Sequence, residues 1–169
     1  MEMIDFVDAD DRVVGRGQRG GARDAGLHYR VAATVVLSAD RVLVYRRPGT
    51  AGVYPGHHDV LVGGTVRSGE SYRQAAEREL AEEFGIRPVL REAVRERRES
   101  PIGPCHLAVY LAEARGRLRP DPAEVDHHEL LSVAEVLARP PRPFVAVGLA
   151  VLRRLFREHP DAFRREPLP

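Results

Sequence analysis

The sequence predicts an α/β protein, in which strands form a central sheet and helices pack against it. Residues 31–38 and 41–47, which read VAATVVLS and RVLVYRR, are rich in the β-branched residues that favour buried strands. Residues 72–84 and 144–159 carry apolar side chains at helical spacing, so each segment predicts a helix with one face toward a core.

Length and composition favour one globular domain that spans residues 1–169. With 43% hydrophobic residues, 169 residues are enough for one core and too few for two ordinary domains. The 26 basic and 25 acidic residues nearly cancel, so no overall charge draws the protein to nucleic acid or to an anionic membrane. A charged partner must therefore be bound locally.

Cysteine usage and hydropathy favour a soluble, cytoplasmic protein. Cys105 is the single cysteine, so no internal disulfide can form. The start, MEMIDFVDAD, lacks the basic and apolar regions of a secretory signal. No apolar run approaches the roughly 20 residues that are needed to span a bilayer.

The first 26 residues are expected to form a hairpin followed by a loop. Residues 3–7 and 12–14 are short apolar runs on either side of DADD, which has the composition of a turn. Residues 16–26, RGQRGGARDAG, are interpreted as a flexible surface loop. A single RGG without interleaved aromatic residues is weak evidence for nucleic-acid binding.

The central strands at 31–38 and 41–47 should pair, because only two residues separate them. After the loop PGTAGVYPGHH, residues 59–66 read as a strand that paired glycines interrupt. Residues 106–114 predict a further strand, and residues 115–129 a long polar loop.

The C-terminal third is expected to hold two helices. Residues 132–138 predict a short helix capped by Ser132, and RPPRP must end it. Residues 144–159 then predict a helix packed on the sheet.

Local signals bound the helix at residues 72–84. Ser71 followed by Gln74 is a capping-box pattern, and Gly85 is a suitable C-terminal stop. At about 100° per residue, Glu79, Glu82 and Glu83 fall on one face. Carboxylates so close would repel one another unless a cation lies between them, and oxygen ligands favour Mg²⁺ or Mn²⁺. A solvated acidic face is the alternative.

The spacing of residues 64–86 decides between these two interpretations. The segment reads Gly64, five residues, Glu70, seven residues, Arg78, Glu79, Leu80, one residue, Glu82, Glu83, one residue, Gly85 and Ile86. This pattern resembles the Nudix box at every defining position. The resemblance implies the family's α/β/α sandwich with a mixed β-sheet, and divalent-cation-dependent hydrolysis of nucleoside diphosphates linked to another group.

The resemblance also implies roles for residues of the box. Glu79, Glu82 and Glu83 look like metal ligands, joined by the carbonyl of Gly63. Arg78 is expected to orient these carboxylates by charge-assisted hydrogen bonds. The cation, Mg²⁺ or Mn²⁺, would neutralise the diphosphate and lower the pKa of an attacking water.

Two further residue groups are site candidates outside the box. Arg46 and Arg47 end a predicted strand and could bind a substrate phosphate. Glu124, in the predicted polar loop, is a candidate metal ligand or catalytic base, because family members often supply one from that region. His57, His58, His127 and His128 are interpreted as surface residues. A homodimer is common in the family, and the group linked to the diphosphate stays open.

The stretches LHYR and YPGHHDVLVGG are similar to the branch that includes isopentenyl-diphosphate isomerases and their hydrolase-like relatives. That isomerase has a catalytic cysteine where this sequence has Gly63, and Cys105 lies far downstream, so hydrolysis is the preferred prediction. A non-catalytic Nudix-like ligand-binding module is the other alternative, although such a module could lose box carboxylates that this chain keeps.

Overall fold

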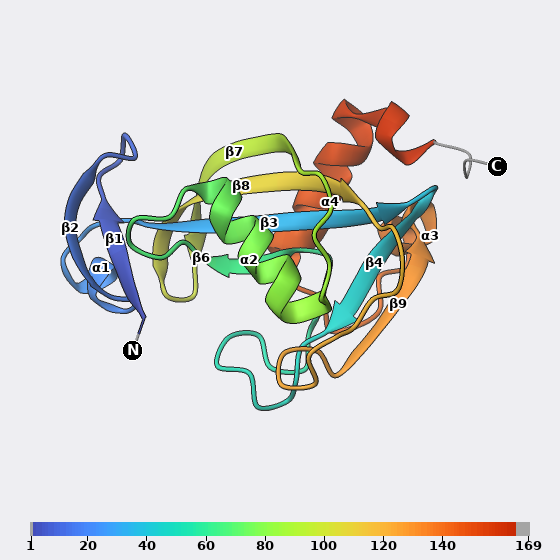
Figure 1. Ribbon diagram of the computed structural model, residues 1–169, viewed down its shortest axis with the longest axis horizontal. Helices are drawn as coiled ribbons and strands as arrows, with labels where there is room; N and C mark the ends of the chain where they lie inside the picture. The colour runs from blue at the N-terminus through green and yellow to red at the C-terminus, as the bar shows by residue number, and fades with distance from the viewer. Residues whose placement is uncertain (1, 165–169) are drawn as a thin grey trace.

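The computed structural model describes residues 2–164, and its long central strand is β3 (Figure 1). The strands are β1 Met3–Val7, β2 Val13–Gln18, β3 Tyr29–Ser38, β4 Arg41–Arg46, β5 His58–Asp59, β6 Val62–Thr65, β7 Arg91–Ser100, β8 Gly103–Glu113 and β9 His127–Ser132. The helices are α1 Gly21–Asp24, α2 Tyr72–Phe84, α3 Val133–Ala138, α4 Ala146–Glu158 and the 3₁₀ turn η1 Pro160–Phe163.

The main sheet is mixed and has seven strands. Its path is β5-β4-β3-β8-β7, with β6 paired to β3 and β9 paired to β4. In the described chain β3 and β8 run parallel, and the other pairs of this sheet are antiparallel. The first half of β3 pairs with β6, and its last two residues pair with β4. β3 and β4 are therefore paired only near the turn that joins them.

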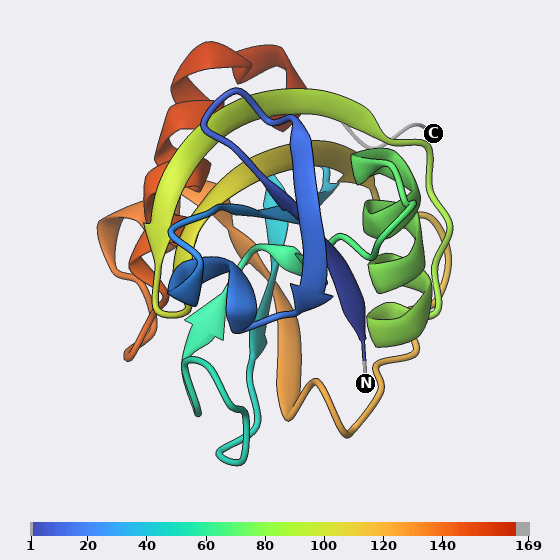
Figure 2. The same cartoon turned by 90° about the vertical axis from the view of Figure 1, so that its left-hand side faces the viewer.

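Alternation along β3 creates two separate cores. Ala32 and Val36 pack in one cluster with Leu80 and other residues of α2. Val35 packs on the opposite face with Leu152 and other residues of α4. Successive side chains of a strand point to opposite faces, so each helix covers one face. Figure 2 shows α2 and α4 on either side of the sheet, which confirms the α/β/α sandwich.

The N-terminal hairpin β1-β2 forms a second, two-stranded sheet, as predicted. Two aspartates fasten it to the main body. Asp5 accepts a hydrogen bond from Ser68 Oγ at 2.6 Å, and Asp11 accepts hydrogen bonds from Arg30 at 2.6 Å and from Tyr72 at 2.9 Å. The hairpin therefore holds both the loop before α2 and the start of α2.

Two predicted boundaries were wrong. Residues 16–26 are not a loop throughout, because β2 continues to Gln18 and α1 follows. Residues 59–66 do not form one strand. Asp59 ends β5 and residues 62–65 form β6, which pair with β4 and β3 respectively. The paired glycines do not interrupt the strand, because both lie within β6.

Two strands lie where none was expected. β7, REAVRERRES, is mostly exposed at the edge of the sheet, and its pairing with β8 defines it. β9 occupies the end of the predicted polar loop and pairs with β4. Neither segment has the apolar content that usually marks a strand. The predicted helices at 72–84, 132–138 and 144–159 are present as α2, α3 and α4. None of the described helices is long and apolar enough to cross a membrane.

Candidate active site

Helix α2 begins and ends where the local signals predict. Ser71 Oγ accepts a hydrogen bond from the Gln74 amide at 3.1 Å, and the Gln74 side chain accepts one from the Ser71 amide at 2.9 Å. Gly85 ends the helix with φ 66°, a left-handed conformation that glycine adopts without strain. These fixed ends determine which side chains of α2 face β6.

Arg78 joins the carboxylates of the box to one another. Its guanidinium donates to Glu70 at 2.8 Å, to Glu79 at 2.6 Å and to Glu82 at 3.3 Å. It also donates to the carbonyl oxygen of Thr65 at 3.1 Å. Burial alone would lower the pKa of Arg78, but the hydrogen bonds to Glu70 and Glu79 outweigh this and raise it. Arg78 is therefore a permanent cation at the centre of the acidic group.

Glu79 and Glu83 form a pair of carboxylates with little exposure to solvent, and the Glu79 side chain is 14% exposed. The Glu83 side chain belongs to a residue that is only 7% exposed, and burial followed by the charges of Glu79 and Glu124 raises its pKa well above the usual value. Burial also raises the pKa of Glu79, although Arg78 opposes this effect. Water therefore does little to stabilise two negative charges here, and a further cation would do so.

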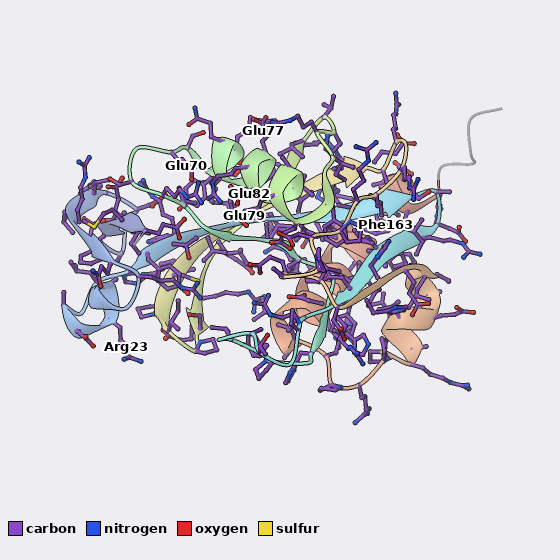
Figure 3. The ribbon with its side chains drawn as sticks, turned by 60° about the horizontal axis from the view of Figure 1, so that its bottom comes forward. Arg23, Glu70, Glu77, Glu79, Glu82 and Phe163 are labelled. Atoms are coloured by element: carbon purple, nitrogen blue, oxygen red, sulfur yellow. The ribbon has the colours of Figure 1, made fainter. Side chains whose placement is uncertain are left out.

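Glu82 lies at the rim of the same face. Its side chain is 50% exposed, and Arg67 approaches it at 3.7 Å. Figure 3 shows Glu79 and Glu82 on one side of α2 and Glu77 on the other side. The three box carboxylates thus share one face, as the helical spacing predicts.

Two glycines of β6 make close packing against this face possible. A Cβ atom at Gly64 would lie 2.7 Å from a carboxylate oxygen of Glu79. A Cβ atom at Gly63 would overlap the backbone carbonyl of Ala32 on β3. A side chain at Gly64 would displace the Glu79 carboxylate, whereas one at Gly63 would push β6 away from β3. The cysteine of the isomerases would therefore not fit at position 63 without a backbone shift.

The donor set fits a hard divalent cation, because it consists of carboxylate oxygens with a backbone carbonyl nearby. In residues 2–164, however, no three His, Cys, Asp or Glu side chains already converge on a point that could hold a metal ion. Arg78 holds oxygens of Glu79 and Glu82. Binding a cation would thus require these side chains to rotate.

A cavity of about 520 Å³ borders these carboxylates. Its floor includes apolar residues of β3 and β8, among them Val31, Ala33 and Leu107. Glu79, Glu82 and Glu83 are among the charged residues at its border. The volume lies within the range of small-molecule sites in proteins.

The structure separates the two arginines that the sequence analysis grouped together. Arg47 lines the cavity, and its Nε donates to the Val53 carbonyl at 2.9 Å. Arg46 does not line it and binds Asp126 instead, with Nε at 2.8 Å from the carboxylate. Arg46 is the last residue of β4 and Arg47 follows it, and the two side chains have different partners.

Glu124 also lines the cavity, although it belongs to a loop far from the box in sequence. The loop is tied to α2, because the Asp121 amide donates to the Glu83 carbonyl at 2.8 Å and the Glu124 amide donates to Asp121 at 3.0 Å. Asp121 thus anchors Glu124 near the carboxylate pair, and the charge of Glu124 contributes to the raised pKa of Glu83.

The remaining candidates from the sequence lie elsewhere. The cavity, as formed by residues 2–164, is lined by none of the four candidate histidines, His57, His58, His127 and His128. Cys105 lines the cavity but is only 5% exposed, and it packs with Ile4 and Tyr29 in a small core. Burial raises the pKa of its thiol to about 11, so the thiol stays protonated near neutral pH.

Asp59 and Tyr54 are among the cavity residues that sequence reasoning missed. Asp59 is buried, accepts hydrogen bonds from the Val60 and Leu61 amides at 2.7 and 3.1 Å, and packs against Gly148 of α4. Tyr54 belongs to the loop between β4 and β5. A buried aspartate at a strand end and a tyrosine in a turn carry no signal in a single sequence.

The fold and the acidic helix face define a class of enzyme, the Nudix hydrolases. The family model described as NUDIX domain matches residues 28–155, so the chain belongs to this family. An uncharacterised Nudix hydrolase of Streptomyces coelicolor is 37% identical over 91% of this chain and 88% of its own length. Another, from Pseudomonas aeruginosa, is 39% identical over 73% of this chain and 75% of its own length.

A solved structure of similar fold comes from Deinococcus radiodurans. That protein, DR0079, has a TM-score of 0.77 and 26% identity, and the match covers 92% of this chain and 100% of the other. The family membership and these relatives make this chain a Nudix pyrophosphohydrolase. Its kinship with the isomerase-like branch stays a prediction.

Proposed function

We propose that the protein hydrolyses the diphosphate bond of a nucleoside diphosphate linked to another group, and that it requires Mg²⁺ or Mn²⁺. The observation that carries this proposal is the pair of poorly solvated carboxylates, Glu79 and Glu83, at the border of a cavity of about 520 Å³. Two adjacent carboxylates in a poorly hydrated place are stabilised by a bound dication, which neutralises both.

The ligands of the cation would be Glu79, Glu82, Glu83 and the carbonyl oxygen of Gly63. A bound cation supplies positive charge that neutralises the diphosphate and makes an attacking water more acidic. Arg78 holds one carboxylate oxygen each of Glu79 and Glu82 through its hydrogen bonds, and so limits the positions that these side chains can take when a cation binds.

Arg47 and Glu124 complete the proposed catalytic site from outside the box. Arg47 places a fixed positive charge in the cavity, where it can bind a phosphate oxygen. Glu124 is an exposed carboxylate at the same cavity and is suited to accept a proton from the attacking water. Arg46 is less suited to bind substrate, because Asp126 already neutralises it.

A substrate panel tests this proposal. Nucleoside triphosphates, nucleotide sugars, ADP-ribose and dinucleotides would each be incubated with Mg²⁺, with Mn²⁺ and with excess chelator. We expect release of phosphate or of a nucleoside monophosphate from at least one substrate, and only with a cation present. Full activity in excess chelator would contradict the metal requirement. Binding without any hydrolysis would favour a non-catalytic module.

The isomerase alternative has its own test. Isopentenyl diphosphate should not be converted to dimethylallyl diphosphate, because Gly63 offers no thiol for proton transfer.

We further propose that residues 1–169 act as one domain in the cytoplasm, where a single buried thiol such as Cys105 stays reduced. Sedimentation would test a homodimer, and a gel-shift assay would test nucleic-acid binding.

A further inference from the structure

The loop between β4 and β5 holds a tyrosine in an unusual backbone conformation. Tyr54 has φ 52°, in the left-handed region that residues with a large side chain rarely adopt. It also directly precedes Pro55, and the residue before a proline is restricted further. Such strain persists only where the surrounding structure imposes it, and it is concentrated at functional sites.

Backbone hydrogen bonds impose this conformation. The Gly56 amide donates to the Pro48 carbonyl at 3.1 Å, and the Arg47 amide donates to the His57 carbonyl at 2.9 Å, so the two ends of the loop are held together. Near the tip, Arg47 Nε donates to the Val53 carbonyl at 2.9 Å. The loop therefore presents Tyr54 and Arg47 to the cavity as one unit.

Packing within the protein does not account for Tyr54. The residue is half-buried and lines the cavity, yet it belongs to none of the apolar clusters of residues 2–164. Its ring meets the ring of His57 at 5.5 Å with a tilt of 55°, which is not a stacked arrangement. Over the described chain its hydroxyl makes no hydrogen bond. The Tyr54 ring therefore stabilises neither an apolar cluster nor a hydrogen bond within the described residues.

The other tyrosine at this cavity is not available to a ligand. Tyr29 is 3% exposed, and its hydroxyl is hydrogen-bonded to Ser100 Oγ at 2.5 Å. Its ring forms part of the core with Ile4 and Cys105. Tyr54 is therefore the aromatic ring that the cavity presents beside Arg47.

We propose that Tyr54 stacks on a flat aromatic ring of the substrate, a nucleobase, and so determines specificity for nucleoside over simple diphosphates. This inference rests on the proposed function. Aromatic side chains stack on any nucleobase, because every base has a π-face. The adjacent Arg47 then binds the diphosphate of the same molecule. A rigid loop with both groups reduces the entropy cost of ordering them on binding.

Two substitutions separate the ring from the loop that carries it. Tyr54→Asn removes the ring, while asparagine tolerates the left-handed conformation, so the loop and Arg47 should keep their places. Tyr54→Phe keeps the ring and removes the hydroxyl. Phe156→Leu, on α4 and outside the cavity, is the matched control for loss of a partly exposed ring.

Calorimetry with two kinds of non-hydrolysable probe measures the contribution of the base. The probes are the α,β-methylene analogues of the common nucleoside diphosphates and methylenediphosphonate, which has no nucleoside, all with Mg²⁺. For the best-bound nucleoside probe, Tyr54→Asn should weaken binding by about tenfold, within the range of one base stack. Its affinity for methylenediphosphonate should not change. Tyr54→Phe and Phe156→Leu should bind both kinds of probe as the wild type does.

Three results would overturn the inference. The wild type could bind no nucleoside probe more tightly than methylenediphosphonate. Tyr54→Asn could bind the nucleoside probe unchanged. It could also lose both kinds of probe equally, which would mean that the loop or Arg47 had moved. The substrate panel tests hydrolysis separately. A failed stacking test would leave the proposed function intact, and an inactive panel would refute the proposed function whatever the calorimetry shows.

Discussion

Replacing Glu83 by Gln should remove one ligand charge while it preserves size and helix propensity. Glu83 is 7% exposed and lies beside Glu79, so its charge is the least hydrated of the box. If Glu83 holds the cation, turnover should fall by roughly 10²–10³, the range for one lost electrostatic element of a catalytic site.

The same substitution should reduce the stabilisation that Mg²⁺ provides. A ligand at 100 times its Kd stabilises the folded state by about 2.7 kcal/mol, and a Kd weakened a hundredfold reduces this to about 0.4 kcal/mol. For a chain of this size, about 1 kcal/mol corresponds to roughly 2–4 °C in Tm. The Mg²⁺-dependent rise in Tm should therefore fall from roughly 5–11 °C to about 1 °C.

The assay is steady-state kinetics and thermal melting on one preparation, with and without Mg²⁺. Glu77→Gln is the matched control, because Glu77 lies across α2 from Glu79, is exposed and carries the same charge (Figure 3). We expect the control to keep both turnover and the Mg²⁺-dependent shift in Tm. Unchanged turnover together with an unchanged shift in the Glu83→Gln protein would remove Glu83 from the site.

Three further substitutions test the geometry around the site. Arg78→Lys keeps the charge but loses the forked hydrogen bonds to Glu70 and Glu79, so kcat should fall about 10–100-fold. An unchanged kcat would argue against an orienting role for Arg78. Gly63→Ala should destabilise the protein by about 1–3 kcal/mol in urea unfolding, since the added Cβ meets the β3 backbone; equal stability would contradict that contact. Burial raises the pKa of Asp59 from 3.8 to about 7, so the folded protein holds a proton there that the unfolded chain releases. The stability of the wild type relative to Asp59→Asn should thus decline as pH rises from about 4 to about 7 and then level off. Urea unfolding of both proteins at pH 5 and pH 8 measures this. A difference in stability between the two proteins that is the same at both pH values would contradict it.

Features that local interactions fix could be predicted from the sequence. Helix α2 was predicted at its observed bounds, because the capping box at Ser71 and the left-handed Gly85 act within a few residues of each end. The same helical geometry placed Glu79, Glu82 and Glu83 on one face. The tight turn between β3 and β4 was predictable for the same reason, since two residues separate strands of strong β propensity.

Features that depend on distant partners could not be predicted from the sequence. β7 is a strand because β8 supplies its backbone hydrogen bonds, although its side chains are mostly charged. The direction of Arg46 and Arg47 followed from where Asp126 and the cavity lie. The position of Glu124 depended on an anchor between its loop and α2. Burial, backbone pairing and cavity walls arise from residues far apart in the chain, so no local pattern in one sequence records them.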